Sequence, residues 1–180
     1  MVGRGLLILF VFQFSFCAGA SNSSLPNEMP KIPKGFHTIA EQENIPVKIL
    51  FALALNESQV RTNYGRVIAW SYTLNHKNRG YHFRTHKELK RKVEDIISQG
   101  YRLFDVGIAQ VNYRWHKDGF SSLDEMINPV SNLTYAAKYL RGFYDKHGDW
   151  WVAVGKYHAP NNKPNAAKYT KKVKNIWLTL

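Results

Sequence analysis

The chain has 180 residues, a single cysteine and a formal net charge of +12. Its length fits one domain with a sizeable hydrophobic core, and the lone cysteine excludes a fold held together by disulfides. The positive charge favours a polyanionic partner. Lysines and acids alternate in stretches such as residues 87–95, as on a solvated helix face, so we expect no nucleic-acid partner.

The N-terminus has the pattern of a secretory signal peptide over residues 1–20. Arg4 supplies the charged start, and residues 6–16 form an apolar run too short to span a bilayer comfortably. Ala18-Gly19-Ala20 then matches the small-residue cleavage pattern. We therefore expect cleavage after Ala20 and export of the mature chain, with an uncleaved anchor as the alternative.

The only cysteine, Cys17, lies inside this predicted signal. A lipoprotein site wants a small residue before the cysteine, and the bulky Phe16 argues against one. The mature chain would then have no cysteine, no transmembrane segment and a net charge of 12 − 1 = +11, since Arg4 leaves with the signal. Such a chain suits a carboxylate-bearing wall polymer or an acidic membrane surface.

Residues 21–35 are rich in Ser, Asn and Pro and are expected to form a flexible leader, followed by one domain over residues 36–180. A short helix from Phe36 is expected to break at Ile45-Pro46. Pro46 is then well placed at the first position of a nearly all-apolar, buried helix that ends in Asn56-Glu57-Ser58. Residues 59–63 are predicted to be a loop.

Aromatic and β-branched residues over 67–83 predict a β-hairpin, with its turn at Asn78-Arg79-Gly80. A capping box at Thr85–Glu88 predicts the start of a helix that Gly100 stops. Three further helices are predicted at 128–147, at 150–157 and from about Pro164. The fold class is therefore mainly α (α+β), with a small β-hairpin insertion.

Glu57 stands at the end of the predicted buried helix. Burial removes water from its carboxyl group, and the negative end of the helix dipole disfavours a carboxylate there. Both effects raise the pKa, as a general acid at neutral pH requires. The alternative is a glutamate that reaches solvent at a frayed helix end, and this feature alone does not separate the two.

Two other segments break the surrounding amphipathic pattern. Residues 105–112 form an apolar run that carries three hydrogen-bonding side chains: Asp105, Gln110 and Asn112. Residues 153–160 place Tyr157 and His158 next to each other at a predicted helix end. Side chains of these types inside apolar segments are candidates for a binding site.

With these segments in order, the chain resembles the soluble-lytic-transglycosylase-type (SLT) muramidases, which have a lysozyme-like helical fold. Residues 46–58 look like the helix that ends in the family's Glu-Ser pair, and Gly107-Ile108-Ala109-Gln110 looks like its Gly-Leu-Met-Gln motif. Residues 153–160 occupy the place of the Ala-x-x-Tyr-Asn-Ala-Gly motif, and residues 166–173 are similar to its closing Tyr-containing helix. The resemblance covers residues 36–177. Residues 70–75 and 105–107 most resemble members linked to conjugation and secretion machines.

The resemblance implies a peptidoglycan lytic transglycosylase that acts in the periplasm on glycan strands. It further implies that the enzyme opens the wall locally for a secretion or conjugation apparatus. It makes Glu57 the catalytic acid and base and implies that Ser58 orients it or holds substrate. It further implies that Gln110, with help from Asn112, binds sugar or acetamido groups and that Tyr157 positions Glu57 or a sugar ring. No cofactor is implied.

The chain departs from the family pattern at three positions, where Ala109 replaces Met, His158 stands for Asn, and Pro160 replaces Gly. His158 is a candidate binding residue, and a partly buried structural histidine is the favoured alternative. Asp105 is a possible second carboxylate that would activate water in a lysozyme-type hydrolase. We favour the alternative that Asp105 caps a short helix from Val106.

Other chemistries have weaker support. The histidines show no metal-ligand spacing, so no metal site is expected, and no Gly-x-Ser-x-Gly context supports a serine hydrolase. Trp115 and the pair Trp150-Trp151 are candidates for stacking on sugars, although the pair is expected to be half core and half surface. A basic wall-binding scaffold without turnover is the rival that is not an enzyme.

Overall fold

The computed structural model describes residues 31–180. The predicted signal peptide and the predicted leader up to residue 30 therefore lie outside the described residues. Within the described part, none of the helices is long and apolar enough to cross a membrane. The first helix begins at Lys34, two residues before the predicted start of the domain.

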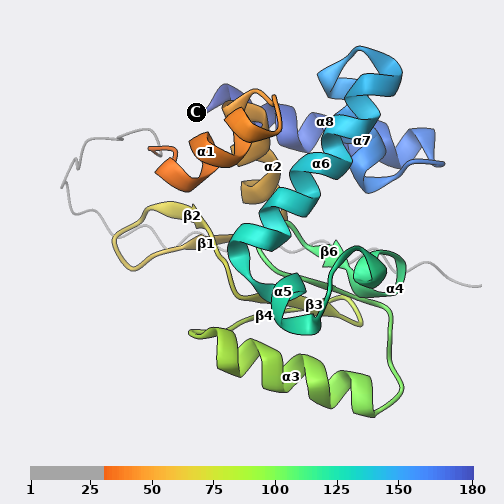
Figure 1. The fold of residues 1–180 in the computed structure, drawn as a ribbon. Coiled ribbons are helices and arrows are strands. Elements are labelled where there is room, and N and C mark those ends of the chain that lie inside the picture. The colour runs from red at the N-terminus through yellow and green to blue at the C-terminus, as the bar shows by residue number, and fades with distance from the viewer. Residues whose placement is uncertain (1–30) are drawn as a thin grey trace, which may run out of the picture.

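Helices dominate the described residues, which confirms the mainly α fold class (Figure 1). The helices are α1 (Lys34–Gln42), α2 (Val47–Ser58), α3 (His86–Ser98), α4 (Tyr113–His116), α5 (Leu123–Ile127), α6 (Pro129–His147), α7 (Trp150–His158), α8 (Lys163–Leu178) and the 3-10 helix η1 (Lys117–Gly119). The strands are β1 (Gln59–Arg61), β2 (Val67–Ala69), β3 (Thr73–His76), β4 (Arg79–His82), β5 (Phe104–Val106) and β6 (Val111–Asn112).

The strands form two antiparallel sheets, the pair β1-β2 and a four-stranded sheet in the order β4-β3-β5-β6. The β3-β4 pair confirms the predicted hairpin for residues 73–82, whereas residues 67–69, which were predicted to belong to it, form β2 and pair with β1 instead. The hairpin turn lies at Lys77-Asn78, one residue before the predicted turn, because both of these residues have positive φ angles of 53° and 60°. A two-residue hairpin turn of this hand needs positive φ at both positions, and Asn tolerates it well.

The prediction of a loop over residues 59–63 was wrong at its start. Residues 59–61 form β1, which pairs with β2 from Gln59↔Ala69 to Arg61↔Val67. The strand is short and largely exposed, so it carries little of the period-2 alternation by which a strand is recognised. Its pairing continues the end of α2 directly into the sheet.

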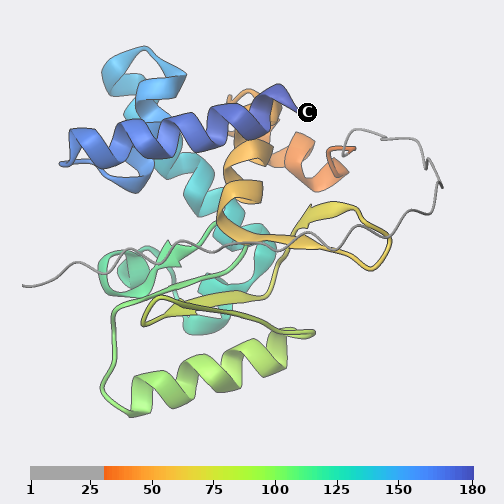
Figure 2. The same cartoon turned by 180° about the vertical axis from the view of Figure 1, so that it is seen from behind.

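Helix α2 forms the centre of the core. Nearly every residue from Ile49 to Leu55 is fully buried, as the apolar pattern predicted, and α2 contacts α1, α8 and β2. Figure 2 shows α8 crossing α2 on one side of the molecule. Pro46 precedes the helix as its cap rather than occupying its first position. The core therefore fixes the position at which α2 ends.

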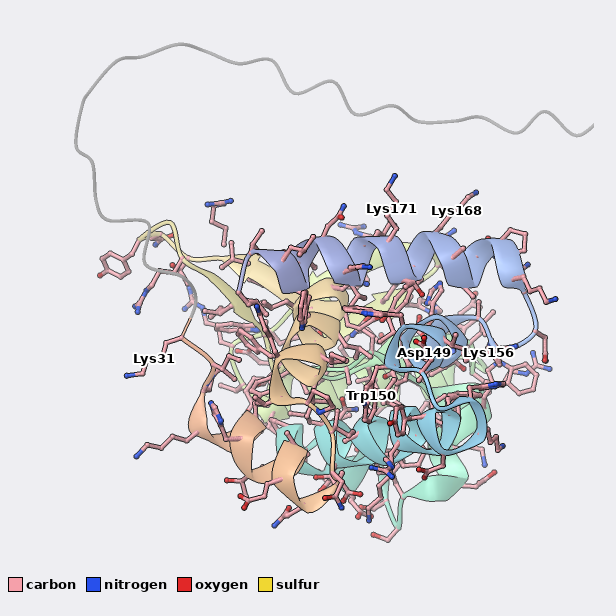
Figure 3. The ribbon with its side chains drawn as sticks, turned by 90° about the horizontal axis from the view of Figure 1, so that it is seen from above. Lys31, Asp149, Trp150, Lys156, Lys168 and Lys171 are labelled. Carbon is pink, nitrogen blue, oxygen red and sulfur yellow. The ribbon has the colours of Figure 1, made fainter. Side chains whose placement is uncertain are left out.

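Helix α8 presents an apolar face inward and a lysine-rich face outward, as predicted. Tyr169 and Val173 are buried. Lys168 and Lys171 are exposed and point away from the molecule in Figure 3, which looks onto this helix. This orientation places the hydroxyl end of Tyr169 toward the buried end of α2.

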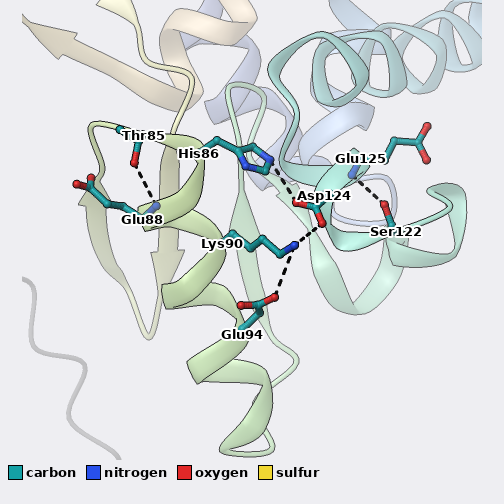
Figure 4. Close-up of polar contacts among 8 residues, drawn as sticks. All are labelled: Thr85, His86, Glu88, Lys90, Glu94, Ser122, Asp124 and Glu125. Carbon is teal, nitrogen blue, oxygen red and sulfur yellow. Dashed lines mark hydrogen bonds and ion pairs between the residues drawn. The ribbon is translucent and has the colours of Figure 1, made fainter.

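Side-chain caps set several helix ends. Thr85 accepts a hydrogen bond from the backbone N–H of Glu88, as the capping box predicts, but the Glu88 carboxylate accepts from the N–H of Arg84 instead of Thr85. Figure 4 shows this cap and the contacts of α3 with α5, where Lys90 and His86 meet Asp124. Figure 1 shows α3 below β3 and β4, on the side away from α2 and α6, and α3 contacts both α5 and β3.

Candidate active site

A cavity of about 780 Å³ lies between the ends of α2 and α7 on one side and β3, β5, β6 and α4 on the other, with α6 closing it. Within residues 31–180, no lysine or arginine lines this cavity, although the chain is strongly basic. The lining consists of neutral amides, aromatic rings, three aliphatic residues and two carboxyl groups: Asn56, Glu57, Asn75, Asp105, Gln110, Val111, Asn112, Trp115, His116, Tyr135, Ala136, Tyr139, Tyr157, His158, Pro160 and Asn161.

Glu57 enters the cavity from the last turn of α2. The Tyr169 hydroxyl on α8 donates a hydrogen bond to its Oε1. The side chain is half-buried, so part of the carboxyl group faces the cavity while protein surrounds the rest. Glu57 is therefore both reachable by a ligand and held in one orientation by a single phenol.

The pKa of Glu57 is raised from 4.5 to about 7. Loss of water around the carboxyl group is the largest cause, and the negative charge of Asp105 adds to it, while the hydrogen bond from Tyr169 acts in the opposite direction. Burial also holds the pKa of Tyr169 well above 10, so its hydroxyl remains a donor. The predicted rise in the pKa of Glu57 is confirmed, with burial as its main cause.

Ser58 is buried and does not line the cavity. Its hydroxyl donates to the carbonyl oxygens of Ala54 (3.0 Å) and Ile108 (2.7 Å). The second bond ties the end of α2 to the turn between β5 and β6. Of the two roles that the resemblance implies for Ser58, orienting Glu57 is the one that this geometry supports.

Asn132 on α6 fixes the same turn and is fully buried. Its Oδ1 accepts from the N–H of Ala109 (3.0 Å), and its Nδ2 donates to the carbonyl oxygens of Val106 (3.0 Å) and Met126 (2.9 Å). Gly107 has a φ of 85°, and a Cβ there would lie 2.5 Å from the Asn132 side chain. Glycine is therefore required here for two reasons, conformation and space.

Gln110 ends this turn and lines the cavity. Its own φ is 48°, which is uncommon for a residue other than glycine. Its Nε2 donates to Thr73 Oγ1 and to the carbonyl oxygen of Gly107, both at 3.0 Å. Within the described part of the chain, the amide oxygen of Gln110 has no protein donor, so this oxygen is available to a ligand N–H or O–H.

The prediction that Asp105 caps a helix from Val106 was wrong, because Asp105 lies in strand β5. Its Oδ1 accepts from Asn112 Nδ2 at 2.8 Å across the β5-β6 pair, and both side chains line the cavity. Burial raises the pKa of Asp105, and the hydrogen bond from Asn112 opposes the rise. Asp105 is therefore a second carboxyl group in the same cavity as Glu57.

Tyr157 and His158 both line the cavity from the end of α7. The Tyr157 hydroxyl donates to the carbonyl oxygen of Ala109 at 2.8 Å, so it supports the floor of the cavity rather than the carboxyl group of Glu57. The His158 ring stacks on Tyr169, with centroids 4.4 Å apart and planes within 3°. His158 is exposed, so the favoured alternative of a partly buried structural histidine was wrong. Partial loss of water still lowers the pKa of its ring.

Tyr169 is the residue of this site that the sequence did not reveal as a site residue. Its spacing with Val173 on α8 is that of a core stripe, and it is indeed buried. Two signals pointed to it: its place in the segment that resembles the family's closing Tyr-containing helix, and its hydroxyl group, since a buried tyrosine needs a hydrogen-bond partner. The partner, Glu57, lies 112 residues away in the sequence.

The structure thus brings Glu57, Asp105, Gln110, Asn112, Tyr157 and His158 to one cavity and leaves Ser58 behind its wall. Among residues 31–180, no group of three or more His, Cys, Asp or Glu side chains is placed to hold a metal ion.

The family model described as Transglycosylase SLT domain matches residues 35–179. Comparison with curated proteins and with solved structures finds no match to this chain. The family match covers nearly all of the described residues, and the helical architecture with its small antiparallel sheets agrees with the lysozyme-like fold of this family. The chain therefore belongs to the transglycosylase SLT domain family, whose activity class is that of peptidoglycan lytic transglycosylases.

Proposed function

We propose that this protein cleaves the β-1,4 bond between N-acetylmuramic acid and N-acetylglucosamine and leaves 1,6-anhydromuramoyl ends, with Glu57 as acid and base. One observation carries the proposal: a single carboxyl group with a pKa of about 7 faces a cavity lined by amides and aromatic rings. Near neutral pH such a group is present in both protonation states, so it can give a proton and take one back.

The first step is protonation of the glycosidic oxygen by Glu57. The C1–O bond breaks, and the N-acetylglucosamine unit leaves with the proton as a free hydroxyl. The acetamido oxygen of the muramoyl unit stabilises the positive charge that develops at C1, as in other substrate-assisted glycosidases. The amide oxygen of Gln110 lies in the same cavity, where it can accept a hydrogen bond from the acetamido N–H.

In the second step, the Glu57 carboxylate removes the proton from the muramoyl C6 hydroxyl. The C6 oxygen attacks C1, and the new O6–C1 bond closes the anhydro ring. Glu57 ends protonated, as it began, and no water is consumed. The hydrogen bond from Tyr169 stabilises the carboxylate between the two steps, because a donated hydrogen bond favours the charged form.

A hydrolase is the second candidate function, because Asp105 shares the cavity with Glu57. In that mechanism Asp105 would remove a proton from water, and the products would carry ordinary reducing muramoyl ends.

Analysis of digested peptidoglycan by mass spectrometry, with and without borohydride treatment, separates the two. Anhydromuramoyl products are lighter by one water and take up no hydrogen from borohydride, whereas reducing ends do. We expect anhydro ends to dominate in the native protein and in Asp105→Asn. Reducing ends that disappear in Asp105→Asn would establish the hydrolase instead.

We further propose export to the periplasm through residues 1–20, on the charged start, apolar run and small-residue cleavage site of that segment. N-terminal sequencing of the exported protein should give Ser21 as its first residue. Retention of residues 1–20 would indicate the uncleaved anchor.

A role in opening the wall for a secretion or conjugation apparatus is a narrower proposal. It rests on the resemblance of residues 70–75 and 105–107 to members with that role. Cells that carry Glu57→Gln in place of the native protein should lose assembly of the apparatus while keeping a normal wall. Normal assembly would contradict this role without touching the enzymatic proposal.

A further inference from the structure

We propose that Trp115 is a stacking platform for a sugar ring at the α4 end of the cavity, a saccharide subsite separate from the Glu57 end. This inference rests on the proposed function, since it assigns part of the glycan strand to a place in the same cavity. It concerns binding and not the chemistry at Glu57, so the two can fail independently.

Trp115 differs from the other four tryptophans of the chain. Among residues 31–180, it is the only exposed tryptophan, with 69% of its surface accessible. The others are partly buried; Trp150 stacks on Tyr144, and Trp151 meets Trp177 edge to face. A large indole ring left in water is costly unless something covers it in use.

The position of Trp115 indicates what covers it. The residue lines the same cavity as Glu57 but belongs to α4, whereas Glu57 belongs to α2. Its neighbours Arg114, Lys117 and Asp118 are exposed and charged. A single aromatic ring in charged surroundings does not form the apolar patch that a protein partner or a membrane requires. A ligand that extends out of the cavity is the occupant that this position fits.

The chemistry of the cavity points to a neutral saccharide. One face of a pyranose ring presents C–H groups that pack on an aromatic plane, while its hydroxyl and acetamido groups need neutral donors and acceptors. Asn75, Asn112 and Asn161 supply such groups along the cavity. Within the described residues, no lysine or arginine lines the cavity, so inside it the sugar hydroxyl and acetamido groups meet amides rather than cations.

One face of the Trp115 indole is free to contact a sugar, because Arg114 covers only the other face. Its guanidinium carbon lies over the Trp115 ring, 4.9 Å from the centroid. This cation–π contact covers one face and favours a fixed ring orientation. The opposite face is then available to a sugar, and the indole N–H, which has no acceptor within residues 31–180, is available to a sugar oxygen.

The test measures binding of β-1,4-linked N-acetylglucosamine oligomers to the full chain in the Glu57→Gln background, by calorimetry. Trp115→Ala should weaken binding of the hexamer about tenfold, and Trp115→Phe, which keeps a flat ring, should weaken it by about threefold or less. The loss should shrink for the dimer, which has fewer sugar rings to place along the cavity. Tyr64→Ala is the matched control, since Tyr64 is 82% exposed and lies outside the cavity.

Tryptophan fluorescence tests the stacking separately, because a purely structural role of Trp115 would not change its emission on hexamer binding. Hexamer binding should shift the tryptophan emission of the parent to the blue, and this shift should be lost in Trp115→Phe, because Trp115 is the exposed tryptophan. A far-UV circular dichroism spectrum identical to the parent shows that each variant is folded.

Unchanged hexamer affinity in Trp115→Ala, or equal losses in Trp115→Ala and Tyr64→Ala, would overturn the platform. Digestion assays keep this result apart from the proposed function. If anhydro ends are formed and Trp115→Ala binds the hexamer as tightly as the parent, the catalytic proposal stands and the subsite is wrong. Weakened binding in Trp115→Ala without any anhydro product would keep the subsite and remove the catalytic proposal.

Discussion

The helical wall and the strand wall of the cavity each hold one carboxyl group, and they hold it differently. Glu57 ends a helix that is buried on nearly all sides, and a tyrosine from α8 donates to it. Asp105 lies in the middle of a three-residue strand, and an asparagine amide from the next strand donates to it. Burial raises the pKa of both, and that of Glu57 reaches about 7.

This difference teaches how the fold assigns roles to two similar groups. A helix end can bring a carboxyl group out of a dense core, where water has been removed, and point it at a cavity. A strand exposes alternate side chains to the same cavity with less protein around them. The helical wall is therefore suited to supply the acid, and the strand wall to supply binding groups and a nearby negative charge.

The substitution Glu57→Gln is the most decisive test of the difference between Glu57 and Asp105. Because one group serves as acid and base, we expect activity on peptidoglycan to fall by at least about a thousandfold. Zymogram clearing and turnover of soluble muropeptide oligomers measure it. A folded variant that still clears the gel would assign the chemistry to another group, with Asp105 as the first to examine.

The same substitution should change stability in a pH-dependent way. The folded pKa of Glu57, about 7, lies above the unfolded value of 4.5, so the folded state binds the extra proton between these values and native stability falls as pH rises through them. Glutamine does not ionise, so Glu57→Gln removes this loss of native stability. Glu57→Gln should be more stable than the native protein above pH 7, by up to about 3 kcal/mol, and equal to it below pH 4.5.

Urea unfolding at pH 4 and pH 8 measures this difference. Glu41→Gln is a suitable control, since Glu41 is an exposed carboxyl group outside the cavity. Equal stability of Glu57→Gln and the native protein at pH 8 would mean that the folded protein does not raise the pKa of Glu57.

Tyr169→Phe removes the donor to Glu57 and keeps the ring on which His158 stacks. The hydrogen bond lowers the pKa of Glu57, so its loss should move the alkaline limb of the pH–activity profile to higher pH, with activity reduced about tenfold. Tyr139→Phe, another tyrosine of the cavity lining, should leave the limb in place. A limb that moves equally in both variants would assign the effect to the cavity in general.

Asp105→Asn should have the smallest effect on activity, and it should shift the alkaline limb in the direction opposite to that of Tyr169→Phe. Its negative charge raises the pKa of Glu57, so neutralising it should move the alkaline limb to lower pH, with activity within about threefold of native. The same kinetic profile measures both variants. A loss of activity comparable to that of Glu57→Gln would mean that the reaction needs Asp105 as much as Glu57.

Features with a local physical cause were predictable. The apolar run of α2, the Asn128 cap and Gly148 stop of α6, and the β3-β4 hairpin all follow from residues close together in the chain. Gly148, for example, has a φ of 67°, which glycine adopts without strain. The raised pKa of Glu57 was predictable in direction from the apolar pattern of α2, although the segments that bury the carboxyl group, α8 among them, are distant in the sequence.

Features that depend on a distant partner were not predictable. Strands β1 and β5 are three residues each and show too little alternation to be recognised, so Gln59–Arg61 was predicted as loop and Asp105 as a helix cap. The need for glycine at position 107 follows from the Asn132 side chain, which reaches it from α6.

By itself, the sequence determined one mainly α domain, a buried helix that ends at Glu57, and the ordered motifs of a transglycosylase. Periodicity specifies which face of a helix is buried, and this is enough to place Glu57 at the edge of the core. Only the tertiary structure decided that Tyr169 is the donor to Glu57, that Asp105 faces the same cavity, and that Trp115 stands exposed at its other end. Burial is a property of each segment, whereas a hydrogen bond or a shared cavity is a property of how segments pack together.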